Sequence, residues 1–177
     1  LSSIEAGEYD LNMENHRLSN LINQTVKAHQ DQARLRNISL NVQLEEDIDI
    51  VVDASAFSII FSNFVTNALK HSPSNSEILI KNDLEDDFLT TLSVIDHGKG
   101  IPKKYRDRVF ERFFRVDKGR AKHSGGTGLG LAISKHLARL MGYEVGMKPN
   151  KPNGSRFWIS VNYASLEEEK SLTPELV

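Results

Sequence analysis

Apolar residues recur along this chain with two different periods, and each period predicts a different kind of element. A spacing of three or four residues predicts helices over residues 17–36, 54–72 and 128–141. Alternating or short continuous apolar runs predict strands over residues 39–44, 49–52, 76–82, 88–96, 143–147 and 156–161. Pro102 suits the first position of a helix and predicts a short one over residues 103–109. In a chain of 177 residues, these elements are expected to form one compact domain.

The helix predicted over residues 54–72 has the clearest pattern. Asp53 precedes it and is a favourable N-cap residue. Its apolar face is formed by Phe57, Ile60, Phe61, Phe64, Val65, Ala68 and Leu69. Beside that face, displaced by about 60° at a turn of about 100° per residue, runs a polar stripe of Asn63, Asn67, Lys70 and His71. One such residue would fit a polar helix flank, but four aligned polar groups beside the core favour a site at the edge of a cleft.

The helix predicted over residues 128–141 has a simpler pattern. It is expected to bury Leu129, Ile133, Leu137 and Leu140, which follow one another at helical spacing. Gly142 is expected to end it, because glycine readily adopts the left-handed conformation found after helices.

Charge is unevenly distributed along the chain. The net charge is −2, yet residues 99–122 hold ten Lys and Arg against Asp107, Glu111 and Asp117, an excess of seven that leaves −9 for the rest. Glycine-rich turns at residues 96–102 and 125–131 flank this basic segment. Because glycine lets backbone N–H groups approach an anion closely, this arrangement predicts a phosphate site. A solvated charged loop is the alternative, and the glycines on both sides favour the site.

Composition and motif spacing exclude several other functions. The chain has no cysteine, so it holds no disulfide, thiolate metal site or cysteine nucleophile. No apolar run approaches the roughly 18 residues that cross a bilayer, and no signal peptide is visible. A pI near 6.3 argues against a dedicated nucleic-acid binder. Neither a standard P-loop nor the glycine spacing of a dinucleotide fingerprint occurs.

Four short motifs follow one another in order: Asn63-Phe-Val-Thr-Asn67-Ala-Leu-Lys70-His71, Asp96-x-Gly98-x-Gly100-Ile101, Phe110-Glu-Arg-Phe113 and Gly126-Thr-Gly128-Leu-Gly130-Leu131. Together they resemble the catalytic ATP-binding domain of sensor histidine kinases, within the superfamily that includes DNA gyrase, mismatch-repair ATPases and heat-shock chaperones. The resemblance covers residues 17–163. It implies an α/β two-layer sandwich, the Bergerat-type ATP-binding fold, in which helices cover one face of a mixed sheet.

The resemblance also implies which residues bind ATP and Mg²⁺. Asn67 would ligate the metal through its side-chain oxygen, a hard ligand that suits Mg²⁺. Lys70 would meet a phosphate, His71 would line the nucleotide, and Asp96 would accept a hydrogen bond from the adenine amino group. The other residues expected around the nucleotide are Asn63, Gly98, Gly100, Ile101, Gly126, Thr127, Gly128, Leu129, Gly130, Leu131 and Ser155.

A loop over residues 111–126, here called the lid, is expected to close over the phosphates. The resemblance implies that Phe110 and Phe113 anchor it and that its candidate phosphate-binding cations are Arg115, Lys118 and Arg120. Because the lid is rich in glycine and in like charges, it is expected to be the most mobile part of the ordered sequence without nucleotide.

A further motif follows these four. In the family it is usually Gly-x-Gly-Ser/Thr-x-Phe, and this chain departs from that pattern. Here it is Pro152-Asn153-Gly154-Ser155-Arg156-Phe157. Proline fixes φ and removes an N–H, so the geometry of this turn is left open by the sequence. Ser155 is still expected to help hold Asp96 near adenine.

The phosphoacceptor motif of the family, His-Glu/Asp-x-x-x-Pro, is absent, since none of the six histidines is followed by an acid. The acceptor histidine is therefore expected upstream of Leu1, and the chemistry would be in-line transfer of the ATP γ-phosphoryl. The alternatives are an ATP hydrolase of the same superfamily and a degenerate ATP-binding regulator. The hydrolases carry a glutamate one helical turn before the metal-binding asparagine, and Asn63, which cannot take a proton, favours the kinase.

The resemblance implies two protein partners, the parent's own dimerisation and phosphoacceptor domain and a response regulator receiver domain, and no nucleic acid. The parent protein is expected to be a homodimer and this chain alone a monomer. A cytoplasmic location is expected for the chain, and membrane anchoring of the parent is left open. Residues 1–12 are expected to end the dimerisation helix, residues 13–163 to form the catalytic ATP-binding domain, and residues 164–177 to be an acidic, disordered tail.

Overall fold

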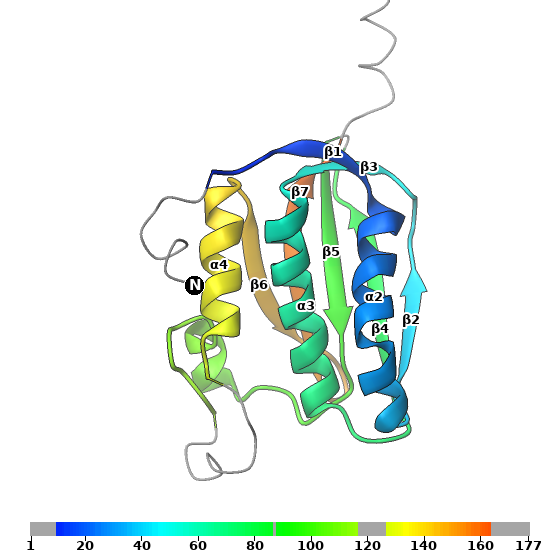
Figure 1. The fold of residues 1–177 in the computed structure, drawn as a ribbon. Helices are drawn as coiled ribbons and strands as arrows, with labels where there is room; N and C mark the ends of the chain where they lie inside the picture. The colour runs from blue at the N-terminus through cyan, green and yellow to red at the C-terminus, as the bar shows by residue number, and fades with distance from the viewer. Residues whose placement is uncertain (1–9, 87, 117–126, 164–177) are drawn as a thin grey trace, which may run out of the picture.

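A mixed five-stranded sheet with α-helices on one face forms the body of the protein (Figure 1). The computed structural model describes residues 10–86, 88–116 and 127–163. The strands lie in the order β2 (Ser39–Gln43), β4 (Glu77–Leu84), β5 (Leu89–Ile95), β7 (Ser155–Asn162) and β6 (Glu144–Pro149). β2 runs parallel to β4, and the other pairs are antiparallel. The expected two-layer α/β sandwich is confirmed.

The helical layer consists of α2 (Leu18–Leu35), α3 (Ala54–His71) and α4 (Gly130–Leu140), with α3 in the middle (Figure 1). A 3₁₀-helix, η1 (Lys103–Arg108), stands where the short helix was expected. α4 begins two residues later than predicted, because Gly128 has a φ of +71° and lies outside the helix. Within the described ranges, no helix is both long and apolar enough to cross a bilayer.

The apolar face of α3 forms the centre of the core. All seven residues predicted for that face are at most 1% exposed, and Phe57 stacks on Phe61 with ring centroids 5.5 Å apart. Burying each phenylalanine contributes about 1.5–3 kcal/mol to folding. The carboxylate of Asp53 caps the helix, accepting a hydrogen bond from the Ala56 N–H at 2.8 Å as predicted. α3 is therefore held firmly between its cap and the sheet.

A two-stranded antiparallel ribbon, β1 (Glu14–Arg17) with β3 (Asp49–Val52), crosses the end of the domain near the start of α3 (Figure 1). β3 was predicted, but β1 was not, because its four residues are polar and show no alternation. Its order comes from pairing with β3 and from the N–H of Asn12, which donates to the Asp53 carboxylate at 2.9 Å.

α4 presents a different face to the core from the one predicted. Leu137 is fully buried as expected, but Leu140 is 38% exposed, and Leu129 and Ile133 are half-buried. The prediction that Leu140 is buried is therefore wrong. The buried residues of the helix are Ser134, Leu137 and Ala138. A buried serine in the first turns of α4 gave no apolar signal in the sequence, which is why the face was misplaced.

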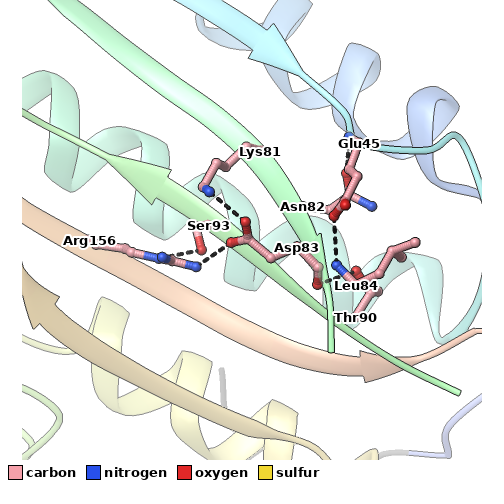
Figure 2. A network of polar contacts seen from close by, with 8 residues as sticks. All are labelled: Glu45, Lys81, Asn82, Asp83, Leu84, Thr90, Ser93 and Arg156. Atoms are coloured by element: carbon pink, nitrogen blue, oxygen red, sulfur yellow. Dashed lines mark hydrogen bonds and ion pairs between the residues drawn. The ribbon is translucent and has the colours of Figure 1, made fainter. Parts of the chain in front are cut away.

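The sheet face away from the helices carries a polar network (Figure 2). On β4, Lys81 and Asp83 alternate with residues that are buried beneath the helices. Asp83 accepts hydrogen bonds from Lys81 at 2.5 Å and from Arg156 at 2.6 Å, and Arg156 also donates to the Ser93 hydroxyl at 2.8 Å. Three strands are thus joined on the solvent side of the sheet.

Candidate nucleotide-binding site

Asp96, at the end of β5, is a carboxylate held by backbone donors. It is 3% exposed, and its Oδ1 accepts hydrogen bonds from the N–H of Gly98 at 2.8 Å and of Ser155 at 3.2 Å. Burial raises the Asp96 pKa above its ordinary value, partly offset by those two donors and by His97. In the described part of the chain, Oδ2 accepts none of the hydrogen bonds found, so this oxygen is left as an acceptor for a ligand.

The turn before β7 is shaped to meet Asp96. Gly154 has a φ of +119°, and a Cβ on it would lie 1.9 Å from the Asp96 carbonyl oxygen. Asn150 closes the turn through its N–H, which donates to the Gly154 carbonyl at 3.1 Å, and its side-chain amide donates to the Asp96 carbonyl at 3.0 Å. The turn left open by Pro152 is therefore closed against Asp96, and Ser155 makes its contact through the backbone N–H.

The loop after Asp96 also packs against the end of α3. A Cβ on Gly98 would lie 2.4 Å from the His71 carbonyl oxygen, and one on Gly100, whose φ is +69°, would lie 3.0 Å from the Gly154 carbonyl oxygen. Glycine is needed at both places for the backbones to approach. The first two motifs and the turn before β7 therefore meet at one end of the sheet.

The polar stripe of α3 borders the core as predicted. Asn63, Asn67 and Lys70 are half-buried, and His71 is exposed. The pKa of Lys70 is lowered from its ordinary value, mainly by burial and then by the positive charge of Arg115. Two cations are thus close enough to repel each other, at the end of the helix that also carries Asn67. Such a pair is stabilised by an anion.

Asn63 joins α3 to the start of α4. Its Nδ2 donates to the Gly130 carbonyl at 2.9 Å and to the Ser134 hydroxyl at 3.0 Å. The motif that begins at Asn63 therefore contacts the glycine motif 126–131 as well as the Asp96 loop. Ser134 was missed by the sequence reasoning, since a serine inside an amphipathic helix carries no signal of its own.

The aromatic motif is only partly arranged as predicted. Phe110 packs edge-on against Phe157, with ring centroids 6.3 Å apart. Phe113 is 71% exposed, so its ring is not packed as that of Phe110 is, and its expected role as an anchor of the lid stays a prediction. The ring of Phe114 is packed instead, 5.7 Å from Tyr105 and beneath the guanidinium of Arg108.

Phe113 takes part through its backbone. Its φ is +62°, and its N–H donates to the Gly128 carbonyl at 3.0 Å. A Cβ on Gly128 would lie 2.9 Å from the Phe113 carbonyl carbon, so the aromatic motif and the glycine motif touch along their main chains. This contact joins the two described segments on either side of residues 117–126.

The remaining predicted residues are distributed around these contacts. Ile101 and Leu131 are half-buried and pack against the core, and Thr127 is exposed, with its hydroxyl accepting from the Leu129 N–H at 3.4 Å. The described residues do not include most of the lid, whose mobility was predicted. Lys118, Arg120 and Gly126 lie in this part of the chain.

Comparison with known proteins agrees with this geometry. The family described as "Histidine kinase-, DNA gyrase B-, and HSP90-like ATPase" matches residues 52–165. The sensor histidine kinase WalK of Bacillus subtilis is 35% identical over 126 residues, which cover 71% of this chain and 21% of WalK. The sensor-like histidine kinase SenX3 of Mycolicibacterium smegmatis is 31% identical over 161 residues, which cover 91% of this chain and 42% of SenX3.

Among solved structures, the full-length ShkA in complex with AMPPNP superposes with a TM-score of 0.80 at 26% identity, covering 93% of this chain and 34% of ShkA. The chain thus spans less than half the length of each of these relatives. The family match includes the stripe of α3, the Asp96 loop and the glycine motif 126–131. The chain therefore belongs to the histidine kinase-, DNA gyrase B- and HSP90-like ATPase family, as an ATP-binding domain of the sensor histidine kinase type.

Proposed function

We propose that this domain binds Mg·ATP and transfers its γ-phosphoryl group to a histidine on a dimerisation domain of the parent protein. The main support for the proposal is that α3, the Asp96 loop and the glycine motif 126–131 contact one another. They bring a carboxylate acceptor suited to adenine, Asp96, to the same end of the sheet as two cations suited to phosphates, Lys70 and Arg115. The parent protein would act as a homodimer and pass the phosphoryl group to a response regulator receiver domain.

Adenine recognition is assigned to Asp96. The Gly98 and Ser155 N–H groups occupy Oδ1, so Oδ2 is the oxygen available to the adenine amino group. An ionised carboxylate only accepts hydrogen bonds, and adenine presents a donor at this edge. Gly100 holds the loop that carries this carboxylate against the turn before β7, since a Cβ there would lie 3.0 Å from the Gly154 carbonyl oxygen.

Phosphate binding is assigned to Lys70 and Arg115 together with backbone N–H groups at the start of α4. The Lys70 pKa is lowered first by burial and then by the positive charge of Arg115, and the negative charge of the phosphates would offset the repulsion between these two cations. The main-chain N–H groups at the N-terminus of α4 also suit an anion, because they can donate hydrogen bonds to phosphate oxygens.

Mg²⁺ is assigned to Asn67. The described residues hold no group of three or more His, Cys, Asp or Glu side chains that would bind a metal alone. This fits Mg²⁺, which is commonly held by one or two protein oxygens with phosphate oxygens and water. The bound ion would neutralise charge on the phosphates, while the protein residues supply positioning.

A phosphotransfer assay tests the proposal. The histidine-bearing dimerisation domain of the parent protein is mixed with this domain, Mg²⁺ and γ-labelled ATP, and phosphohistidine is measured. Wild type should label the partner, and Asn67→Asp should abolish labelling because it adds a negative charge beside the phosphates. Asn23→Asp, an exposed asparagine on α2, is the matched control and should transfer normally. Steady ATP turnover by the domain alone would favour hydrolysis instead, and transfer by Asn67→Asp at the wild-type rate would refute the metal assignment.

A further inference from the structure

The side-chain amide nitrogen of Asn63 is held by two groups of α4. Its Nδ2 donates to the Gly130 carbonyl at 2.9 Å and to the Ser134 hydroxyl at 3.0 Å, two acceptors that are themselves 3.0 Å apart. Because the Gly130 carbonyl can only accept, the NH₂ group must face it, and the amide cannot be turned over without losing this bond. The orientation of the Asn63 amide is therefore set by groups on α4.

The same contacts decide what Asn63 offers to a ligand. Within the described residues, its Oδ1 accepts none of the hydrogen bonds found, and a Cβ on Gly130 would lie 3.0 Å from it. Glycine at position 130 thus leaves this oxygen uncovered. Asn63 and Asn67 are four residues apart on α3 and lie on the same side of the helix.

Ser134 completes a closed set of hydrogen bonds. It is 0% exposed, its hydroxyl donates to the Gly130 carbonyl at 3.0 Å, and the same oxygen accepts from Asn63. A serine hydroxyl has one proton to donate, and here it is used within α4, which leaves the oxygen to hold the Asn63 amide. Without this hydroxyl, the Asn63 amide nitrogen would lose one of its two acceptors on α4.

We propose that Ser134 is a positioning residue of the nucleotide site. It fixes the Asn63 amide so that Oδ1 faces outward as an acceptor one turn before Asn67, where it orders a water molecule of the Mg²⁺ hydration shell. This inference rests on the proposed function, since it concerns how the Mg²⁺ that accompanies ATP is held. Losing a group that orients a metal ligand typically lowers metal affinity or activity by roughly 10- to 100-fold.

The test is the affinity for ATP with and without Mg²⁺, measured by calorimetry on the whole domain. Ser134→Ala should weaken Mg·ATP binding about tenfold while changing the affinity for metal-free ATP by no more than about twofold. Ser134→Thr keeps the hydroxyl and should restore most of the Mg²⁺ dependence. Thermal unfolding of each variant shows that it is folded.

Ser93→Ala is the matched control. Ser93 is also 0% exposed and also accepts one side-chain hydrogen bond, from Arg156 at 2.8 Å, but it lies on the opposite face of the sheet. Its loss should lower stability and leave both ATP affinities unchanged. If Ser134→Ala weakens ATP binding equally with and without Mg²⁺, or not at all, the inference is overturned and the proposed function stands. A wild-type domain without affinity for ATP overturns both.

Discussion

Gly154 lies directly against the carbonyl oxygen of Asp96, so closely that a Cβ on the glycine would come within 1.9 Å of that oxygen. Gly154 also adopts a φ of +119°, which side chains rarely allow. The position of the buried Asp96 carboxylate therefore depends on a glycine almost sixty residues later in the chain.

Gly154→Ala should disturb the site as well as the fold. The added methyl group must push the turn away from Asp96, so ATP affinity should fall at least about tenfold. Gly142→Ala is the control, because Gly142 also has a positive φ, +80°, but nothing lies within 4 Å of a Cβ there. It should cost about 1 kcal/mol of stability from backbone strain alone and leave ATP affinity unchanged. Calorimetry and thermal unfolding measure both effects, and equal loss of affinity in the two variants would contradict the account.

Asp96→Asn should weaken ATP binding without lowering the stability of the domain. The asparagine oxygen can still accept from Gly98 and Ser155, which directs the NH₂ group toward the adenine amino group, donor against donor. ATP affinity should fall at least about tenfold.

The ionised Asp96 carboxylate lowers the stability of the folded domain at neutral pH. Its folded-state pKa is raised, so the native protein holds this proton more tightly than the unfolded chain. The contribution to stability therefore declines as pH rises from the unfolded pKa through the folded one, and the charged carboxylate carries a cost at neutral pH. At pH 7 the asparagine variant should unfold at the same temperature or higher. A clearly lower unfolding temperature would mean that Asp96 is a structural residue.

Lys70→Met tests the phosphate assignment. Its folded-state pKa is lowered by burial and by Arg115, so the charged lysine costs stability at neutral pH, and this cost disappears as pH rises through the folded pKa toward the unfolded one. Methionine keeps most of the side-chain length without the charge, and the variant should be at least as stable as wild type without nucleotide. It should nevertheless bind ATP about tenfold more weakly, since a charge-assisted hydrogen bond is worth about 1.5–3 kcal/mol. Lys27→Met, an exposed lysine on α2, should change neither property.

Asp83→Asn tests the network on the outer face of the sheet. Burial pushes the Asp83 pKa upward, but the hydrogen bonds and charges of Lys81 and Arg156 outweigh it, and the folded-state pKa is lowered. Its stabilising effect is present above the unfolded pKa and is lost as pH falls through the folded one.

The Asp83 side chain is 35% exposed, so Asp83→Asn should cost about 1 kcal/mol at pH 7 and progressively less as pH falls through the folded-state pKa. Asp31→Asn, whose carboxylate is 94% exposed, should cost nothing over the same pH range. A difference between Asp83→Asn and wild type that is independent of pH would contradict the assignment. ATP affinity should be unchanged, because the network lies on the face away from the helices.

The sequence predicts those elements and site residues whose pattern lies within one continuous segment of the chain. α3 was predicted nearly to the residue, because its cap at Asp53 and its apolar face are both written in one continuous segment. The glycines at positions 98, 100 and 154 were likewise visible, and the structure adds the reason for them, which is contact between backbones.

What the sequence did not reveal depends on partners distant in the chain. The order of β1 comes from β3, more than thirty residues later, and not from its own polar residues. Asn150 and Ser134 act through side-chain hydrogen bonds to residues distant in the chain, which no period or motif marks. The choice between Phe113 and Phe114 as the packed ring was decided by one positive φ, which turns the first ring outward.

The central claim is that this domain binds ATP and recognises adenine through Asp96. The most direct test is calorimetric titration of the wild-type domain with ATP and with GTP, both in the presence of Mg²⁺. Guanine presents a carbonyl where adenine presents its amino group, so two acceptors would face each other in a buried place. ATP should bind at least about tenfold more tightly than GTP. Equal affinity for the two nucleotides, or no affinity for ATP, would contradict the claim.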